Sequence, residues 1–323
     1  MLDTQTFAAW ACDAGFTKVG FCSPERFVLS EQIVNAQEPL SERKQLCFSP
    51  LDDLPETKSL AVLLWPYTPA PSPGKDDVFV DSYYAASNAA YHAARTLETR
   101  LLNAGCYAKA NVAYPAKEAA VRADMGVIGK NSLLITPEYG TRIVIILMAT
   151  GIEAPQSSGL PSSRKSCIEC GRCIQACPSG ALDEKGLSHP ERCLRNFMME
   201  GVVVPEKLRT KIGMRLIGCD ICQRVCPMQT CVESKKNNVY MLGEFITEDP
   251  AAFSSAAVRL ADEIGRNTAR PQRIRAQAAL LAGNSRNRRY LPVLRNWAQL
   301  PFEAVREHAR WAIRQIELEN ENT

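Results

Sequence analysis

Two short stretches decide what this chain can be: residues 167–178 read CIECGRCIQACP, and residues 219–227 read CDICQRVCP. Nine of the thirteen cysteines are concentrated between residues 167 and 231. We expect the thiols of a chain without an export signal to stay reduced, so metal ligation explains them better than disulfides. The chain has only three histidines. The metal must therefore be held mostly by thiolates, which favours iron–sulfur clusters or all-cysteine zinc.

The first stretch has the C-x2-C-x2-C-x3-C-P spacing of bacterial [4Fe–4S] proteins, and the second supplies C-x2-C-x3-C-P. In such pairs the last cysteine of one run usually ligates the cluster held by the other run. Following this crossover, we assign one cluster to Cys167, Cys170, Cys173 and Cys226, and the other to Cys177, Cys193, Cys219 and Cys222. Cys231 is then a spare thiol. Two zinc sites are the alternative, although zinc ribbons rarely place cysteines this densely.

Two adjacent clusters of this kind work at low potential, about −400 mV in related ferredoxins, and transfer one electron at a time. We therefore expect a low-potential electron donor, such as a ferredoxin or flavodoxin, as a partner. The sequence gives little support for a nucleotide as the electron acceptor. No G-x-G-x-x-G follows a predicted strand, and Gly126–Lys130 lacks the first glycine of a phosphate loop. The sequence also lacks a Ser–His–Asp motif.

The composition predicts a folded protein with about two domains, since the 323 residues are 46% hydrophobic and 23% charged. The formal net charge of +3 indicates no obligatory acidic partner. The start, residues 1–16, has neither the basic nor the apolar region of a secretory signal. The most apolar runs are far shorter than the ~20 residues of a membrane span. We therefore expect a cytoplasmic location and no membrane span.

The organisation along the chain predicts three parts. An α/β domain over 1–155 is indicated by apolar runs that alternate with helical patterns: Lys18–Cys22, Ser59–Trp65 and Arg142–Met148 as strands, and Ala86–Ala104 as a helix. A loop over Glu153–Lys165 leads to the cysteine-rich domain at 160–235. An all-helical part at 250–320 follows, with amphipathic helices expected at Ala256–Gly265, Arg270–Ala282, Tyr290–Ala298 and Phe302–Ile316.

The helical part is strongly basic. Between residues 253 and 316 there are twelve arginines, no lysine and four acidic residues, an excess of eight positive charges. Arginines on one side of stacked helices would neutralise phosphates and bind a polyanion such as tRNA in a salt-sensitive way. A solvated helical face is the alternative.

The whole arrangement resembles the epoxyqueuosine reductase family, the cobalamin-dependent iron–sulfur enzymes of queuosine formation in tRNA. The resemblance rests on Tyr91-His92, the run Gly126-Val-Ile-Gly-Lys-Asn-Ser132, the two cysteine runs, and tail segments beginning at Ala282 and Glu307. It implies a corrinoid on the α/β domain, a bacterial-ferredoxin-like two-cluster domain, and HEAT-like helices in the tail. It also implies that the residues contacting the corrinoid are Tyr91, His92, Gly126, Gly129, Lys130 and Asn131. His92 as a core contact and Lys130 as a solvated lysine are the alternatives.

One departure from the family pattern concerns the proton donor. Where the family has an aspartate three residues before a proline, this chain has Val112 before Pro115. Valine cannot transfer a proton, so a neighbour substitutes or the reaction differs. Tyr114 and Lys117 are the candidate catalytic residues, with the tyrosine phenol polarised by the lysine ammonium. A packed Tyr114 and a structural ion pair at Glu118 are the alternatives.

Three functions follow from these observations. The first is a corrinoid-dependent iron–sulfur reductase similar to epoxyqueuosine reductase, on the same or a related substrate. The second is a protein that binds and reduces or processes a corrinoid for another enzyme. The third is an electron-transfer protein with two clusters and no corrinoid.

Overall fold

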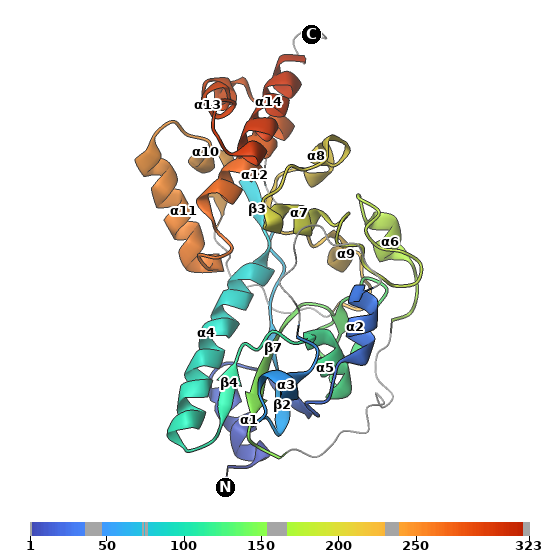
Figure 1. The fold of residues 1–323 in the computed structure, drawn as a ribbon. Coiled ribbons are helices and arrows are strands. Elements are labelled where there is room, and N and C mark those ends of the chain that lie inside the picture. The colour runs from blue at the N-terminus through green and yellow to red at the C-terminus, as the bar shows by residue number, and fades with distance from the viewer. Residues whose placement is uncertain are drawn as a thin grey trace.

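The structure is a computed structural model that describes residues 2–35, 47–72, 74, 77–153, 167–229 and 239–318. The predicted loop at Glu153–Lys165 falls almost wholly outside these ranges, and so does Cys231. The chain folds into an N-terminal sheet with helices and a largely helical second half (Figure 1). Within the described ranges, no helix is both long enough and apolar enough to cross a bilayer.

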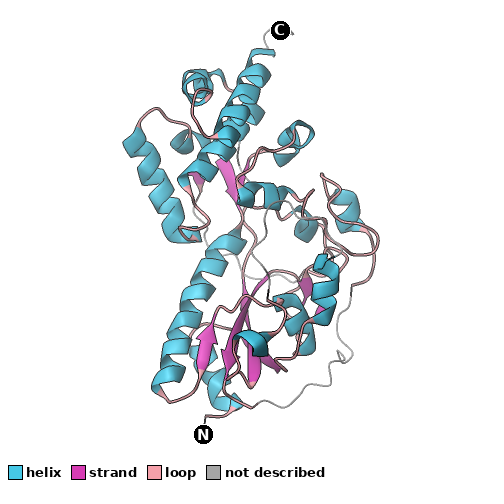
Figure 2. Cartoon of the chain, viewed as in Figure 1, coloured by secondary structure: helices cyan, strands magenta, loops and turns pink. Residues whose placement is uncertain are grey.

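The N-terminal sheet has the strand order β1 (Lys18–Cys22), β2 (Ser59–Pro66), β7 (Ile143–Thr150), β4 (Ala108–Ala110). The three long strands match the predicted apolar runs to within two residues. Every pairing in the sheet is antiparallel. Helices lie beside this sheet (Figure 2), so the domain mixes strands and helices as the sequence predicts, but the sheet contains no parallel pair.

The central strand β2 is buried on both faces, which explains its nearly unbroken apolar sequence. Ala61 and Leu63 face one core together with α1 (Thr4–Asp13) and α4 (Ser82–Asn103). Leu60, Val62 and Leu64 face the opposite core together with α5 (Ala116–Arg122). Two smaller helices, α2 (Val28–Asn35) and α3 (Pro50–Asp53), complete this part.

Helix α4 begins four residues earlier than the predicted helix. Asp81 is its N-cap, and the carboxylate of Asp81 accepts a hydrogen bond from the Tyr83 amide at 3.0 Å. Ala90, Ala94, Leu97 and Leu101 then recur on the face that packs against the sheet.

A second sheet joins distant parts of the chain. Strand β3 (Asp77–Val80) pairs in parallel with β8 (Arg215–Ile217) and antiparallel with β9 (Tyr240–Met241). The core around it includes Val78 and Tyr84 from the N-terminal part and residues of the following helices: α7 (Leu194–Glu200), α8 (Glu206–Ile212), α10 (Leu242–Phe245), α11 (Pro250–Ile264), α12 (Pro271–Ser285), α13 (Leu291–Trp297) and α14 (Glu303–Leu318). The cysteine-rich and helical parts thus share one core.

The C-terminal helices lie near their predicted positions, with α13 preceded by the 3-10 turn η1 (Arg288–Tyr290). The close packing of α12 on α14 depends on Gly283, where a Cβ atom would lie 2.6 Å from the Trp311 ring. His308 on α14 is fully buried, accepting from the Val204 amide at 2.9 Å and donating to the Ala276 carbonyl at 2.8 Å. It therefore ties α14 both to α12 and to the loop before α8.

Candidate iron–sulfur centre and adjoining pockets

Four cysteines from the two runs surround one cavity of about 330 Å³. Cys167 and Cys170 lie in the loop before α6 (Arg172–Ala176), Cys173 lies in α6, and Cys226 follows α9 (Ile221–Arg224). Within the described ranges, no three His, Cys, Asp or Glu side chains converge on a single-ion position. Thiolates spread around a volume are what a cubane needs, since each of its four irons takes one thiolate.

The other four cysteines form a second group. Cys177 follows α6, Cys193 is the N-cap residue of α7, Cys219 follows β8 and Cys222 lies in α9. The Cys222 thiol interacts electrostatically with Cys219, Cys193 and Cys177, and also with Cys173 of the first group. Cys226 interacts with Cys167 and Cys170. Cysteines of the two runs therefore lie close together, and their division into two sets of four ligands stays a prediction.

Burial disfavours thiolates at this site without a positive partner. It raises the pKa of Cys219 to about 11, and it raises the pKa of Cys222 further. Bound iron would supply the positive charge that keeps these sulfurs deprotonated.

The hairpin of β5 (Val127–Ile128) and β6 (Leu134–Ile135) packs against the first cysteine group. Lys130 and Asn131 line the same cavity as the four cysteines. The Lys130 ammonium lies 3.3 Å from the Glu169 carboxylate, within the first cysteine loop. The Ser132 hydroxyl donates to the Gly186 carbonyl at 2.7 Å. The hairpin is thereby fastened to the cluster-binding segment.

Packing accounts for the two glycines predicted to contact the corrinoid. A Cβ atom on Gly126 would lie 2.3 Å from the Ile135 carbonyl oxygen, and one on Gly129 would lie 2.7 Å from the Ile135 side chain. Gly126 is therefore required for the close approach of β5 to the β6 backbone, whereas a larger residue at Gly129 would need the Ile135 side chain to shift.

Tyr91 and His92 lie elsewhere, in a pocket of about 1010 Å³ between α4, the end of α11 and the turn at 265–268. Their rings meet edge to face, with the ring centroids 5.4 Å apart. Asn88 fixes the wall of this pocket, donating from Nδ2 to the Glu263 carbonyl at 3.2 Å. The structure thus separates the six predicted corrinoid contacts into two places.

The sequence predicts that the Lys117 ammonium polarises the Tyr114 phenol, but each of the two side chains has another partner in the structure. The Tyr114 hydroxyl, on a side chain only 7% exposed, donates to the Asp53 carboxylate at 2.8 Å. Burial and this carboxylate raise the pKa of Tyr114. The Lys117 ammonium donates to the Ser132 carbonyl at 2.7 Å, facing the hairpin. The phenol is therefore paired with a carboxylate, which sequence reasoning could not foresee across 61 residues.

Desolvation, and after it the positive charge of Arg195, lowers the pKa of Lys117, whose side chain is exposed. Val112 packs beside the core that holds Tyr114. Glu118 forms an ion pair with Arg122 at 2.7 Å and accepts from the Ser30 amide, in agreement with a structural role.

A buried carboxylate lies within the second cysteine run. Asp220, between Cys219 and Cys222, accepts a hydrogen bond from Arg224 at 2.9 Å and lies 3.9 Å from Arg142. Burial, together with the nearby Asp220 charge, raises the pKa of Asp81 to about 6.

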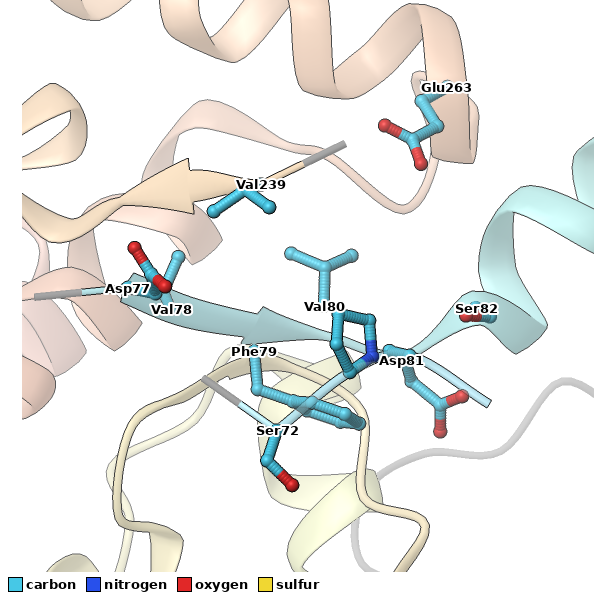
Figure 3. A pocket seen from close by; sticks show the side chains of 11 residues that line it. Ser72, Asp77, Val78, Phe79, Val80, Asp81, Ser82, Val239 and Glu263 are labelled. Atoms are coloured by element: carbon cyan, nitrogen blue, oxygen red, sulfur yellow. The ribbon is translucent and has the colours of Figure 1, made fainter. Parts of the chain in front are cut away.

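Asp81 also lines a pocket of about 450 Å³ along β3. Figure 3 shows that the carboxylates of Asp77, Asp81 and Glu263 point in different directions around it. They do not converge on one ligand position.

Comparison with known proteins agrees with the cysteine groups. Residues 166–229 match the family described as a 4Fe-4S double cluster binding domain. The chain is 39% identical over 112 residues to the epoxyqueuosine reductase of Bacillus subtilis, covering 35% of this chain and 28% of the relative. It is 43% identical over 108 residues to that of Listeria monocytogenes, covering 33% and 28%. These alignments span less than a third of the relatives' own length.

Solved structures match over nearly the whole chain. A selenomethionine-labelled epoxyqueuosine reductase superposes with a TM-score of 0.79 at 23% identity, covering 99% of this chain and 94% of the other. An epoxyqueuosine reductase with an epoxyqueuosine-modified tRNA stem loop gives 0.77 at 22% identity, covering 97% and 89%. The chain therefore has the fold of the epoxyqueuosine reductases, carries a 4Fe-4S double cluster binding domain, and is related to this family in sequence.

Proposed function

We propose that the chain is a corrinoid-dependent iron–sulfur reductase that converts epoxyqueuosine to queuosine in tRNA. The observation that carries the proposal is the set of eight cysteines inside the matched double cluster domain, of which Cys167, Cys170, Cys173 and Cys226 line one cavity. The curated relatives and the structures of the same fold are named for this activity. We take the functional parts to be 1–155, 160–235 and 250–320, the last as HEAT-like helices.

The residues that would hold the two clusters are the cysteines assigned above. One group is Cys167, Cys170, Cys173 and Cys226, and the other is Cys177, Cys193, Cys219 and Cys222. When bound, the clusters supply single electrons at low potential. The short helices α6 and α9 bring the two runs together, so that each run contributes to both groups.

The pocket at Tyr91 and His92 fits part of a corrinoid. Its wall carries phenol, imidazole, hydroxyl and amide groups, which hydrogen-bond to the amides around a corrin ring. The hairpin residues Gly126, Gly129, Lys130 and Asn131 would form the side nearer the clusters. When bound, the corrinoid supplies a cobalt centre that passes electrons to the substrate.

Lys117 supports the role of proton donor better than Tyr114. A general acid works best when its pKa lies near the working pH. The Lys117 pKa is lowered from the ordinary 10.5, towards that range, whereas the Tyr114 pKa is raised, away from it. The ammonium is held by the Ser132 carbonyl and remains in contact with solvent, from which it can be reprotonated.

The positive charge of the arginine-rich helices supports binding of tRNA. Acidic side chains neutralise part of this charge. Arg259, Arg295 and Arg310 pair with Glu244, Glu317 and Glu307. Arg266 and Arg270 are exposed at the turn between α11 and α12, and Arg266 borders the pocket at Tyr91. We propose that these two contact phosphates.

The test uses full-length protein reconstituted anaerobically with iron and sulfide. Hydroxocobalamin is added, and a base-off absorption spectrum is expected. A strong one-electron donor and tRNA containing epoxyqueuosine follow, and nucleoside mass spectrometry is expected to detect queuosine. The double variant Arg266→Ala/Arg270→Ala should bind tRNA more weakly, and its binding should depend less on salt concentration. Arg310 is paired with Glu307, so Arg310→Ala is the control and should change neither property.

The two other functions are outcomes of the same experiment. Base-off binding without queuosine formation would contradict the tRNA substrate and support a corrinoid-processing role. Fully loaded clusters without any base-off spectrum would contradict both corrinoid functions and support electron transfer alone.

A further inference from the structure

The side chain of Asn131 has an unusual environment. It is only 5% exposed, and its Oδ1 accepts a hydrogen bond from the Leu133 amide at 3.2 Å. Because a backbone N–H can only donate, the atom facing it must be the oxygen. The other end is therefore the NH₂ group, and this Nδ2 is buried without a hydrogen-bond partner.

Asn131 shares its cavity with the first cysteine group. The cavity is lined on one side by Asn131, Lys130 and Ile135 of the hairpin, and on the other by the ligating loop with Cys167, Cys170, Cys173 and Cys226. The backbone of Gly129 approaches the amide closely, since a Cβ atom added there would lie 3.0 Å from Asn131 Oδ1. The contacts Lys130–Glu169 and Ser132–Gly186 hold the two sides together.

An unpartnered amide is not by itself a sign of a ligand. In the described part of the chain, Gln277 on α12 is also fully buried with both amide atoms unpartnered, and nothing in the structure explains it. Asn131 differs because four cysteines surround the same cavity. The donor and the sulfur atoms that could accept its hydrogen bond are therefore in one place.

We propose that the Asn131 amide donates a hydrogen bond to a sulfur of the cluster held by Cys167, Cys170, Cys173 and Cys226. This inference rests on the cluster assignment of the proposed function. Reduction adds negative charge to the cluster sulfurs, so an N–H donor stabilises the reduced form more than the oxidised form. Asn131 is thus a positioning and tuning residue that raises the potential of this cluster relative to an apolar side chain.

The first experiment measures both midpoint potentials by EPR-monitored titration of the reconstituted full chain without cobalamin. Asn131→Leu removes the donor and keeps much of the volume, while Ile135→Val is the matched control on the same cavity wall. We expect Asn131→Leu to lower the reduction equilibrium constant of the first cluster about tenfold, which is 59 mV for one electron. The second cluster and Ile135→Val should stay at the wild-type values. Equal midpoints in Asn131→Leu and wild type would overturn the inference.

A second measurement does not depend on a stable Leu variant. Wild-type protein labelled with ¹⁵N in the asparagine side-chain amide is reduced, and the hyperfine coupling of ¹⁵N to the cluster is recorded by pulsed EPR. Asn131→Asp has nearly the same shape and lacks the nitrogen, so a coupling present in wild type and absent in this variant is expected. A spectrum unchanged by Asn131→Asp would contradict the inference.

Iron analysis separates this inference from the proposed function. Protein with about eight irons per chain but no Asn131 effect would leave the cluster assignment intact and remove only the tuning role. Protein without iron would remove both.

Discussion

The cluster-binding segment, residues 167–229, and the helical region, residues 250–318, share one core but are stabilised in different ways. The helices α11, α12 and α14 are 15 to 16 residues long and bury regular apolar faces. In the cluster-binding segment, α6 and α9 have only 5 and 4 residues, and the segment buries ligand sulfurs and charges beside them. The helical region is stabilised by packing, whereas we expect the part of the cluster-binding segment around α6 and α9 to depend on bound iron as well.

The contrast is clearest in two buried polar side chains. His308 in the helical region has both ring nitrogens hydrogen-bonded within the protein. Asn131, beside the first cysteine group, keeps an unpartnered Nδ2. The first arrangement is complete in the chain as it stands, and we propose that a bound cluster completes the second. The predictions below separate the two regions.

The largest effect is expected from removing a cluster ligand. Cys226→Ser should lower the iron content from about eight to about four per chain, because one cubane loses a thiolate and the other keeps all four. Reductase activity should disappear. The exposed Cys12 provides the control, since Cys12→Ser should keep all the iron.

The same variant tests the crossover. EPR of Cys226→Ser should lose one of the two signals, and Cys222→Ser should lose the other. If both variants removed the same signal, the division of the eight cysteines would be wrong. Unfolding of α12 and α14 in Cys226→Ser would contradict the expectation that packing stabilises the helical region without the lost cluster.

The next effect concerns proton transfer by Lys117 in α5, which contacts the hairpin packed against the cluster-binding segment. Lys117→Arg keeps the positive charge but cannot give up its proton, so turnover should fall about 10²–10⁴-fold. In wild type, activity should decline as pH rises through the lowered Lys117 pKa, because the donor must be protonated. The residual activity of Lys117→Arg should not decline over this pH range.

Tyr114→Phe is the matched control for that experiment. Its raised pKa makes Tyr114 a poor acid, so turnover should change little, and the lost hydrogen bond to exposed Asp53 should cost about 0.5–1.5 kcal/mol of stability. A Tyr114→Phe protein that folds but does not turn over, beside an active Lys117→Arg, would reverse the assignment.

The last prediction concerns the pH dependence of the stability of the helical region. Burial lowers the pKa of His308 to about 4, against an ordinary value of 6.5. The unfolded chain therefore binds a proton that the folded chain excludes, so stability is complete above pH 6.5 and falls as the pH drops towards 4. The loss should reach about 3 kcal/mol. Hydrogen exchange of α12 and α14 measures it, and His308→Gln should flatten this dependence.

The sequence predicted the regular elements well where one local signal dominates. Apolar runs located β1, β2 and β7, and apolar periodicity located α11 to α14. The cysteine spacing predicted a domain with two clusters, which the match to the double cluster family confirms, because ligand geometry restricts that spacing strongly.

Features set by distant pairing could not be predicted. The sheet β8-β3-β9 is built from strands of two to four residues that are far apart in the chain, so none carries a periodic signal. The Tyr114–Asp53 hydrogen bond and the approach of the β5–β6 hairpin to the cysteines are likewise products of folding. They decide which of the predicted site residues lie together.

The most direct test of the central claim is the metal content and Mössbauer spectrum of full-length protein prepared without oxygen. The account predicts about eight irons per chain, all in cubane [4Fe–4S] clusters, with Cys226→Ser and Cys222→Ser each retaining about half. Zinc in place of iron, or a single cluster that survives in both variants, would contradict it.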